Sequence, residues 1–461
     1  MDPETGLDGV RNIGIRGDRI VNISERPLQG REVVEVSGYV IAPGFIDLHA
    51  HGQTNEANEY QVHDGVTTAL ELESGNPFLT YWLASRTGNA LINFGSSVSH
   101  QFARAMVMKK YTPQANMARR IIEAEGLNSG RLDSLYGIMN GSFYEPLREE
   151  EIELMTEALG AGLADGGLGI GVPVGYYPGA THDEIFRVYT FAASKQAPVF
   201  THVRDNGIPY IQEAIANAAV TGAPLHIVHV NSMALGAIST ALDMIAAAQH
   251  QGLDITTELY PYTAGSTSLQ SARFDEGWQE RRGISYADLQ WEKTGERLTE
   301  KTFKKYRKEG GIVIVHSMKQ EWIDMGIRSP ITMIASDGMP YAPRAHPRSA
   351  GTFARVLGRY VREQRALSLM EALGKMTIRP AQRLEGIAPS MRLKGRLQVG
   401  CDADLTVFDP NSIIDTATYE KGLSFSEGVY HVLVNGTFVV KAGKTVSGVY
   451  PGRPVLGRYR R

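Results

Sequence analysis

Short apolar runs separated by amphipathic stretches recur along most of this chain. Runs of this kind, rich in β-branched residues, are typical of buried strands, and helical patterns lie between many of them. Thr181–Glu184 and Ser368–Glu371 are typical of capping boxes that open two of those helices. The expected strands are eight: 45–49, 66–72, 90–94, 168–172, 198–202, 225–230, 255–260 and 332–335.

Alternation of strands with helices predicts a parallel sheet, and eight strands are the number that a (β/α)8 TIM-like barrel needs. A doubly wound open sheet is the alternative. No glycine-rich nucleotide-binding motif follows any of the predicted strands, and this disfavours nucleotide binding. The fold class that we predict is therefore α/β, with a barrel as its main body.

Both ends of the chain carry strand patterns that resemble each other. Asn435-Gly436 lies between two β-rich runs, which is a strong hairpin signal. We expect the ends to join as one small β-sandwich domain. The predicted divisions are 1–42 for its first part, 43–394 for the barrel and 395–461 for its second part.

Two stretches interrupt the alternation. Residues 104–142 lie between barrel elements and are interpreted as surface decoration. Residues 266–311 are rich in Glu, Lys and Arg and predict a charged helical insertion. This insertion follows a strand end, where barrel loops build active sites, so a lid over a substrate is a second interpretation.

Composition narrows the choice of protein class. The chain has 461 residues, 43% of them hydrophobic, and a net charge of −3 from 47 basic and 50 acidic residues. No basic stripe indicates a nucleic-acid partner, and the apolar runs are too short to indicate a membrane span. Cys401 is the single cysteine, which excludes an intramolecular disulfide and a thiolate-rich zinc site. Without a secretory signal after Met1, we expect a cytoplasmic enzyme; a homo-oligomer is left open.

Histidines stand at the ends of several predicted strands. His49 and His51 follow the first strand and project to the same side, because side chains alternate along a strand. His202 ends the fifth strand, His229 the sixth, and Asp337 follows the eighth. In a barrel these ends meet at one face, so the five residues predict a metal site there. For His49 and His51 alone, two structural histidines in a loop are the alternative.

Several motifs carry a resemblance to the amidohydrolase superfamily, and within it to the N-acyl-D-amino-acid deacylase (D-aminoacylase) branch. The opening motif lies at 43–51, and the other matching segments are 201–204, 260–267, 336–338, 346–357 and 400–405. The resemblance covers nearly the whole chain. It implies zinc, one or two ions per chain, and hydrolysis of a small amide substrate that carries a carboxylate.

The resemblance also implies roles for single residues. His49, His51 and Asp337 would hold one metal ion, and His202 and His229 the other or only ion. Asp337 would also carry the proton from the attacking water to the departing amine. Arg348 matches an arginine that binds the substrate carboxylate, which suits a planar guanidinium. Tyr260 matches a tyrosine that assists it, although ordinary packing at a strand end is an equal alternative.

The chain departs from the family pattern at two places. The family has a cysteine ligand after the second strand, where this chain has Ser74 and no cysteine. We predict that Glu73 bridges the metal ions instead, with Glu71 as the fallback, because an anionic oxygen can hold two zinc ions together. The second departure is Asn231, which stands where the family has a lysine that helps to bind the substrate carboxylate.

His100, just past the third strand, is a further candidate for the substrate pocket, with a structural role as the alternative. His226 lies within an apolar run and is interpreted as a core residue. Two other functions stay open: a cyclic amide hydrolase or deaminase with the same metal site, and a non-catalytic binding protein on the same barrel. The segment 167–174 has no lysine that could bridge two metals as in cyclic amide relatives, which favours the deacylase.

Overall fold

The structure is a computed structural model that describes residues 1–127 and 129–460. Its centre is a sheet of eight parallel strands, ordered in space as they are along the chain. Each strand overlaps one of the predicted runs: β4 (Phe45–Asp47), β5 (Val66–Asn76), β6 (Asn93–Ser99), β7 (Ile170–Pro173), β8 (Val199–His202), β9 (Leu225–Ile227), β10 (Ile255–Leu259) and β14 (Thr332–Ile334).

The sheet closes where β14 meets β4. Ala50 and Gly338 pair as a parallel bridge, and the N–H of His51 donates to the Gly338 carbonyl at 2.7 Å. The N–H of Ser336 donates to Asp47 Oδ1 at 3.0 Å. These contacts lie just beyond the carboxyl ends of both strands. The predicted barrel is therefore confirmed, and its closure brings the segment after β4 beside the segment after β14.

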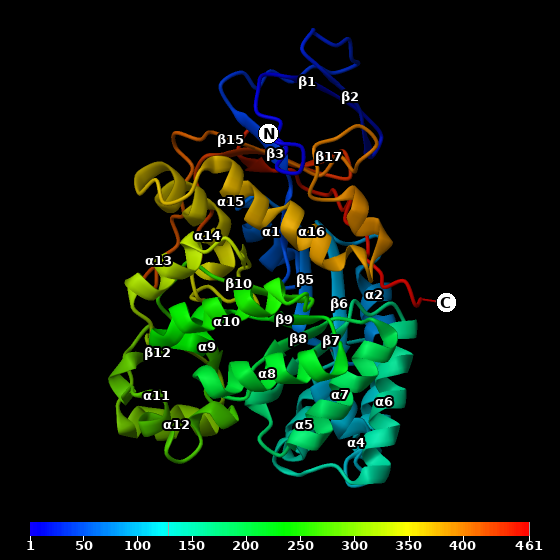
Figure 1. Ribbon diagram of the computed structural model, residues 1–461, viewed down its shortest axis with the longest axis vertical. Helices are drawn as coiled ribbons and strands as arrows, with labels where there is room; N and C mark the ends of the chain where they lie inside the picture. The colour runs from blue at the N-terminus through cyan, green and yellow to red at the C-terminus, as the bar shows by residue number, and fades with distance from the viewer. Residues whose placement is uncertain (128, 461) are drawn as a thin grey trace.

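Helices surround the barrel on its outside (Figure 1). Ser368 and Glu371 form the predicted capping box, whereas Thr181 accepts a single hydrogen bond from the N–H of Glu184. The helices are α1 (Asn55–His63), α2 (Leu79–Arg86), α6 (Glu149–Ala164), α7 (His182–Lys195), α8 (Ile208–Thr221), α10 (Ile238–His250), α13 (Gln320–Arg328), α14 (Arg348–Arg355), α15 (Leu369–Met376) and α16 (Ile378–Glu385).

One stretch of this outer layer, Val230–His250, is long and apolar enough by length and composition to cross a membrane, with a mean hydropathy of 1.3. The sequence analysis did not expect such a stretch. In the structure it is divided into α9 (Val230–Ala234), a 3-10 turn (Leu235–Ala237) and α10. One face of α10 is buried, through Ile238, Ala241 and Ile245. Its apolar residues thus cover the barrel.

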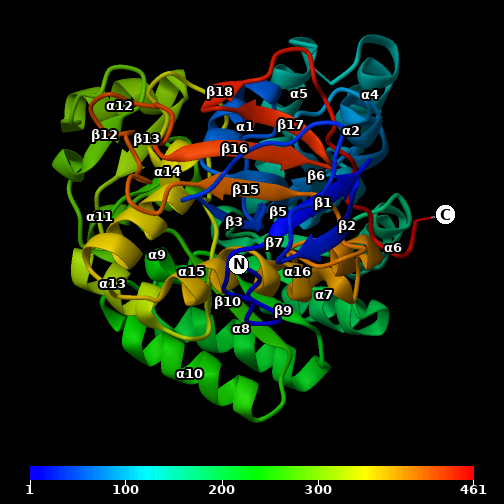
Figure 2. The ribbon, with the colours of Figure 1, turned by 90° about the horizontal axis from the view of Figure 1, so that it is seen from above.

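The two ends of the chain meet on one side of the barrel (Figure 2). β3 (Val40–Pro43) joins β15 (Leu405–Phe408), β16 (Val429–Val434), β17 (Thr437–Lys441) and β18 (Lys444–Thr445) in one antiparallel sheet. β1 (Asn12–Arg16) and β2 (Arg19–Ser24) form a separate hairpin. A small core that includes Ile20, Leu405 and Leu433 packs the hairpin against the sheet. The predicted β domain is present, while the exact boundaries stay predictions.

The predicted hairpin at Asn435-Gly436 connects β16 to β17. Both residues have positive φ, 48° for Asn435 and 76° for Gly436. A two-residue turn between antiparallel strands requires this backbone conformation, which Asn and Gly adopt more readily than other residues. The Asn-Gly pair therefore predicted the turn correctly, because both residues readily adopt the positive φ angles found there.

The insertion at 266–311 is not purely helical, as the sequence had suggested. β11 (Gly265–Ser268), β12 (Leu289–Trp291) and β13 (Ile312–Val315) form an antiparallel sheet, beside α11 (Trp278–Arg282) and α12 (Glu300–Glu309). The insertion has its own core, which includes Trp278, Trp291 and Phe303. Its charged residues cover the outside of this core. The high content of Glu, Lys and Arg therefore predicted helices, although part of the insertion forms strands.

The segment at 104–142 continues from β6 as helices. It contains the second half of α3 (His100–Val107), then α4 (Thr112–Glu125), α5 (Arg131–Met139) and the start of a 3-10 helix (Asn140–Tyr144). α4 and α5 share a small core with Phe78. None of the residues of the predicted metal site comes from this segment, which agrees with its interpretation as decoration.

Candidate metal centre

Six predicted site residues come together at the carboxyl-terminal face of the barrel. His49 and His51 follow β4, Glu73 lies near the end of β5, and His202 ends β8. His229 and Asp337 follow β9 and β14. Two groups of three have ligand atoms that all lie within 4.8 Å of one another, and His49 belongs to both: His49, Glu73 and His229; and His49, His51 and Asp337.

Glu73 lies between the two halves of this cluster. Its Oε2 atom is 3.4 Å from Nε2 of His49 and 3.4 Å from Nε2 of His51. Its Oε1 atom is 2.9 Å from Nδ1 of His202 and 3.0 Å from Nε2 of His229. Each carboxylate oxygen thus faces one pair of imidazoles, which is the arrangement that a bridging ligand needs. This geometry supports Glu73 over the fallback Glu71.

Asp337 completes the half that contains His49 and His51. Its Oδ1 atom lies 3.4 Å from Nε2 of each of these histidines. Asp337 has a φ of 50° and His229 a φ of 34°, a left-handed conformation that is uncommon for residues other than glycine. Such strained backbone concentrates at functional sites, where the surrounding structure holds it in place.

The orientation of the first two histidines is fixed by carboxylates on their other nitrogen. Nδ1 of His49 lies 2.6 Å from Glu258 Oε1, and Nδ1 of His51 lies 2.6 Å from Glu71 Oε2. When both rings are neutral and both Nδ1 atoms donate, as metal binding requires, the two Nε2 atoms present lone pairs to each other across 3.3 Å. Two lone pairs at this distance repel unless a cation lies beside both. Glu71 therefore orients a ligand instead of facing the centre.

Glu258 was missed by the sequence analysis. It lies on β10, is fully buried, and its second oxygen is 3.2 Å from Nε2 of His226. His226 therefore supports Glu258, which in turn holds His49, and the interpretation of His226 as a core residue agrees with its position. The available signal was a glutamate within an apolar strand, since buried carboxylates need a partner.

The charges of the cluster also call for a cation. Burial opposes ionisation of Glu73, but His49 and the hydrogen bonds from His202 and His229 outweigh it, so the pKa of Glu73 lies well below its usual range. Burial would likewise lower the pKa of His49, yet the carboxylates of Asp337 and Glu73 raise it well above its usual value. The described side chains thus hold an excess of negative charge around His49. Four imidazoles with carboxylate oxygens suit zinc, so the residues fit this metal.

Arg348 lies at the edge of the cluster, at the start of α14. Its Nη1 atom is 2.8 Å from Asp337 Oδ2, and its guanidinium carbon is 4.5 Å from the centre of the Tyr260 ring. Both side chains are almost completely buried. Two of the three residues that the sequence had assigned to substrate binding, Arg348 and Tyr260, therefore lie together, beside the predicted proton carrier.

Comparison with known proteins identifies the family. The model of the amidohydrolase family matches residues 32–440. The chain belongs to the amidohydrolase family. Among curated proteins it is similar to a D-aminoacylase of Alcaligenes xylosoxydans xylosoxydans, with 30% identity over 97% of this chain and 93% of the relative. It is equally similar, at 30% over 94% and 91%, to an N-acyl-D-glutamate deacylase of the same organism.

Solved structures of other amidohydrolases share the fold. An N-acyl-D-glutamate deacylase from Bordetella bronchiseptica, in complex with zinc and a phosphonate inhibitor, superposes with a TM-score of 0.81 at 24% identity, over 99% of this chain and 97% of that one. A D-aminoacylase structure gives a TM-score of 0.79 at 25% identity, with coverage of 99% and 98%. The predicted family, fold and enzyme class are confirmed. Zinc is bound in the N-acyl-D-glutamate deacylase structure, and the residues of the cluster in this chain fit the same metal.

Asn231 marks the departure of this amidohydrolase from the family pattern. It is fully buried, and its Nδ2 atom donates to the Tyr260 carbonyl at 3.2 Å. Its Oδ1 atom has no hydrogen-bond partner among the described residues. The amide therefore packs beneath Tyr260 and brings no positive charge to the substrate side of the site.

His100 does not reach the cluster. It is fully buried, with Nδ1 at 2.9 Å from the Tyr177 hydroxyl and Nε2 at 3.1 Å from Glu184 Oε1. Glu184 also pairs with Arg104 of α3. Because both ring nitrogens of His100 face protein groups in a buried network, the structure does not support the predicted role in substrate binding. The structural alternative describes this residue.

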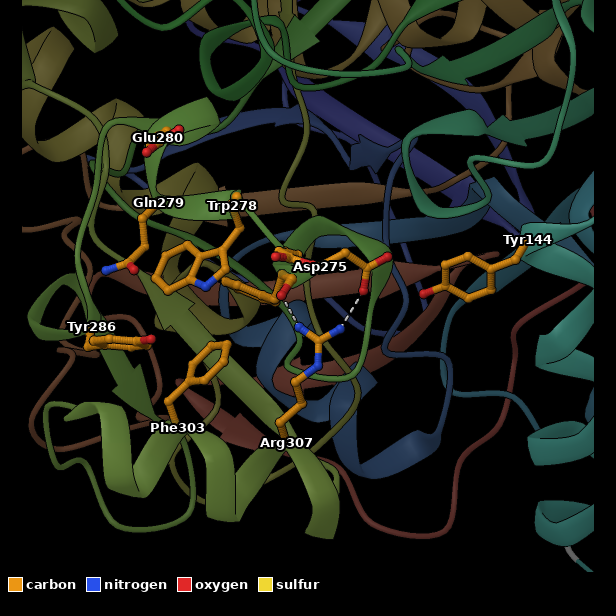
Figure 3. Close-up of a pocket in the computed structure, with 11 residues that line it drawn as sticks. Tyr144, Asp275, Trp278, Gln279, Glu280, Tyr286, Phe303 and Arg307 are labelled. Carbon is orange, nitrogen blue, oxygen red and sulfur yellow. Dashed lines mark hydrogen bonds and ion pairs between the residues drawn. The ribbon is translucent and has the colours of Figure 1, made fainter.

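A cavity of about 900 Å³ lies on the insertion, and none of the six ligand residues lines it (Figure 3). Trp278 and Phe303 form its wall, and Tyr144 approaches from the other side. Its cation, Arg307, pairs with Asp275. This cavity therefore holds none of the six ligand residues, and we assign the chemistry of the amidohydrolase to the cluster.

Proposed function

We propose that this amidohydrolase hydrolyses the amide bond of N-acyl amino acids that keep a free carboxylate, with a preference for the D configuration. The observation that supports this most strongly is Glu73, whose two oxygens face separate pairs of imidazoles. The relatives at 30% identity, a D-aminoacylase and an N-acyl-D-glutamate deacylase, support the substrate class and its configuration.

The ligand residues have separate tasks in this proposal. His49, His51 and Asp337 would hold one zinc ion, His202 and His229 the other, and Glu73 would join them. Zinc bound here supplies hydroxide at neutral pH and polarises the substrate carbonyl. Glu258 and Glu71 keep the Nδ1 atoms of His49 and His51 protonated, so that the Nε2 atoms of both face the centre.

Asp337 moves the proton. Burial opposes its ionisation, but the Arg348 guanidinium and His49 outweigh burial and hold the pKa of Asp337 below its usual value. The carboxylate is therefore ionised at neutral pH and accepts the proton of the attacking water. It then donates this proton to the nitrogen of the departing amine, which leaves as a neutral group.

Arg348 and Tyr260 position the substrate. Asp337 and the Tyr260 ring fix the guanidinium of Arg348, so it loses little freedom when it binds a carboxylate. A substrate held at its carboxylate presents its amide to the centre in one orientation. Positioning of this kind lowers the activation barrier of hydrolysis, because the substrate loses its translational and rotational freedom on binding and not in the transition state.

Turnover on matched substrates tests the proposal. Zinc-loaded protein is assayed with N-acetyl-D- and N-acetyl-L-amino acids, the corresponding amides that lack the carboxylate, and a panel of cyclic amides. We expect hydrolysis of the D series and little hydrolysis of the amides. Hydrolysis of cyclic amides alone would favour the ring-opening alternative. Stoichiometric zinc without turnover on any of them would favour a binding protein.

A further inference from the structure

Arg348 and Tyr260, which position the substrate in the proposed function, come from different elements of the fold. Arg348 is the first residue of α14, whereas Tyr260 follows β10. Their relative position depends on how the start of α14 lies against residues 260–264, which connect β10 to β11. A guanidinium binds a carboxylate in one plane and at short range, so a small shift between the two elements weakens binding.

His346 lies between these two elements. It stands two residues before Arg348 and is fully buried. Its Nδ1 atom accepts a hydrogen bond from the backbone N–H of Arg348 at 3.0 Å. Its Nε2 atom lies 2.9 Å from the carbonyl oxygen of Ala264, the last residue before β11. One imidazole therefore joins the start of the helix to the segment that follows β10.

Both contacts of His346 require the same neutral form of the ring. Nδ1 carries no proton because it accepts from Arg348, so Nε2 carries the proton and donates to the Ala264 carbonyl. Burial, and then the charge of Arg348, hold the pKa of His346 well below its usual value. The donor and the acceptor of the neutral ring are thus both used within the protein.

Three tyrosine rings surround His346. The ring centres of Tyr262 and Tyr419 lie 5.5 Å and 5.2 Å from that of the imidazole, and both rings are nearly perpendicular to it. Tyr260 itself lies 6.4 Å away. Tyr419 comes from the connection between β15 and β16, so the small β domain takes part in this packing. Edge-to-face packing of this kind keeps the two ring nitrogens directed at their partners.

The other hydrogen bonds between the start of α14 and this segment are longer. The Nη2 atom of Arg348 lies 3.4 Å from the Ser266 carbonyl oxygen. The hydroxyl of Tyr262 lies 3.5 Å from the carbonyl oxygen of Pro347. Both distances are at the upper limit for a hydrogen bond. Among the described residues, His346 therefore provides the shortest such link.

We propose that His346 is a positioning residue, which holds Arg348 against the segment that carries Tyr260 and so prepares the substrate site before the substrate binds. This inference rests on the proposed function. The first N–H groups of a helix have no partner within the helix, so the Nδ1 contact satisfies one of them and fixes the backbone of Arg348. The Nε2 contact fixes the ring to the segment. A site that is ordered in advance loses less freedom on binding.

Two variants of similar shape separate the two contacts. The side chain of His346→Gln can still donate to Ala264 but leaves the N–H of Arg348 without an acceptor, and that of His346→Asn does the reverse. We expect each variant to raise KM for the preferred N-acetyl amino acid by about five- to tenfold, the effect of one buried hydrogen bond, with a smaller change in kcat. A wild-type KM in either variant would overturn the inference, because it needs both contacts.

His431→Gln is the matched control. His431 is buried on β16, and its Nδ1 atom accepts a hydrogen bond from the backbone N–H of Ala442 at 3.1 Å. This variant therefore loses the same kind of contact as His346→Gln, but within the small β domain. Its KM should stay within about twofold of the wild type. Zinc content, measured by elemental analysis, should equal that of the wild type in all three variants.

A double-mutant cycle shows whether His346 acts through Arg348. In the Arg348→Gln background the guanidinium is absent, so the added His346→Gln should change kcat/KM by less than about twofold. A further loss as large as the one that His346→Gln causes in the wild type would overturn the inference, because His346 would then act independently of Arg348.

Crystals of His346→Gln provide a measurement that does not depend on turnover. We expect Arg348 to shift and its contact with Asp337 Oδ2, 2.8 Å in the wild type, to lengthen. Arg348 in its wild-type position would overturn the inference whatever the enzyme hydrolyses. A wild type that hydrolyses no N-acyl amino acid would instead contradict the proposed function, so the two failures are distinguishable.

Discussion

At the scale of single residues, the carboxylate of Glu73 separates this site from one built on a thiolate. A carboxylate has two donor atoms about 2 Å apart, so it can face two ions with one oxygen each. Here Oε2 faces His49 and His51, and Oε1 faces His202 and His229. The carboxylate thus brings a negative charge to both halves of the cluster.

Glu73→Gln is expected to lower zinc affinity by more than about 100-fold, since it removes the charge that both halves share. Glu71→Gln is the control, because among the ligand side chains Glu71 contacts only His51, at the nitrogen that points away from the centre. It should lower zinc affinity by about 10–100-fold and retain measurable turnover. Elemental analysis after dialysis against a zinc buffer measures both. Equal zinc content in Glu73→Gln and the wild type would contradict the bridging role.

Asp337→Asn tests the proton carrier. We expect kcat to fall by a factor on the order of 10²–10⁴, the usual contribution of a general base, while His49, His51 and Glu73 still retain metal. Zinc content and kcat are measured on the same preparation. Full turnover with zinc bound would show that another group carries the proton.

Most of the residues of this site could be predicted from the sequence, but Glu258 and the buried position of His100 could not. His49, His51, His202, His229 and Asp337 each follow a recognisable strand, so their convergence follows from the barrel alone. Glu258 was not found because its place within a strand indicates burial but does not show which histidine its carboxylate contacts. His100 was assigned to the pocket because sequence shows where a strand ends, but not which buried partners take the ring nitrogens.

At the scale of elements, the backbone of α14 is held by the carboxylate of Asp64, which lies at the C-terminal end of α1. Gly351 has non-helical backbone angles and interrupts α14. Just beyond it, the N–H groups of Phe353 and Ala354 both donate to the carboxylate of Asp64, at 2.8 Å each. Asp64 thus caps the second part of α14 and fixes the turn that carries Arg348.

Asp64→Ala is expected to lower the free energy of unfolding by about 1–2 kcal/mol, as the loss of a helix cap does. It should also raise KM more than it lowers kcat, because Arg348 shifts with its helix. Ser368→Ala, which removes the cap of α15, is the control: it should lower stability by a similar amount with KM unchanged. Chemical denaturation and steady-state kinetics give both quantities. If both variants leave KM unchanged, Asp64 has no part in positioning Arg348.

The wrong predictions of β6 and of the insertion each have a physical explanation. The third strand was expected at 90–94, but β6 begins at Asn93. Asn93 is fully buried, and its Nδ2 atom donates to the Thr67 carbonyl and to Asp404 Oδ2. A polar residue satisfied by partners far along the chain looks like a strand end in a hydropathy pattern. In the same way, the charged surface of the insertion concealed its strands.

At the scale of the whole molecule, one buried amine makes stability depend on pH. Lys375 of α15 is almost completely buried, and its Nζ donates to the carbonyl oxygen and the hydroxyl of Thr332 on β14. Burial, and then the charge of Arg379, lower the pKa of Lys375 from 10.5 to about 7. Between pH 7 and 10 the unfolded chain therefore binds more protons at this residue than the folded chain does.

Stability should accordingly rise as pH increases from about 7 toward 10, at up to roughly 1.4 kcal/mol per pH unit from this group. Lys375→Met should remove this contribution, whereas Lys308→Met, at an exposed lysine of α12, should leave it in place. Urea denaturation at several pH values measures the slope. Identical slopes in wild type and Lys375→Met would show that the amine does not titrate in this range.

The central claim concerns where zinc binds in the assembled barrel, and anomalous scattering at the zinc edge tests it most directly. In zinc-saturated crystals, the account predicts one peak between His49, His51 and Asp337 and a second between His202 and His229, with an oxygen of Glu73 beside each. Zinc-saturated crystals with no peak within coordination distance of Glu73 would contradict the account.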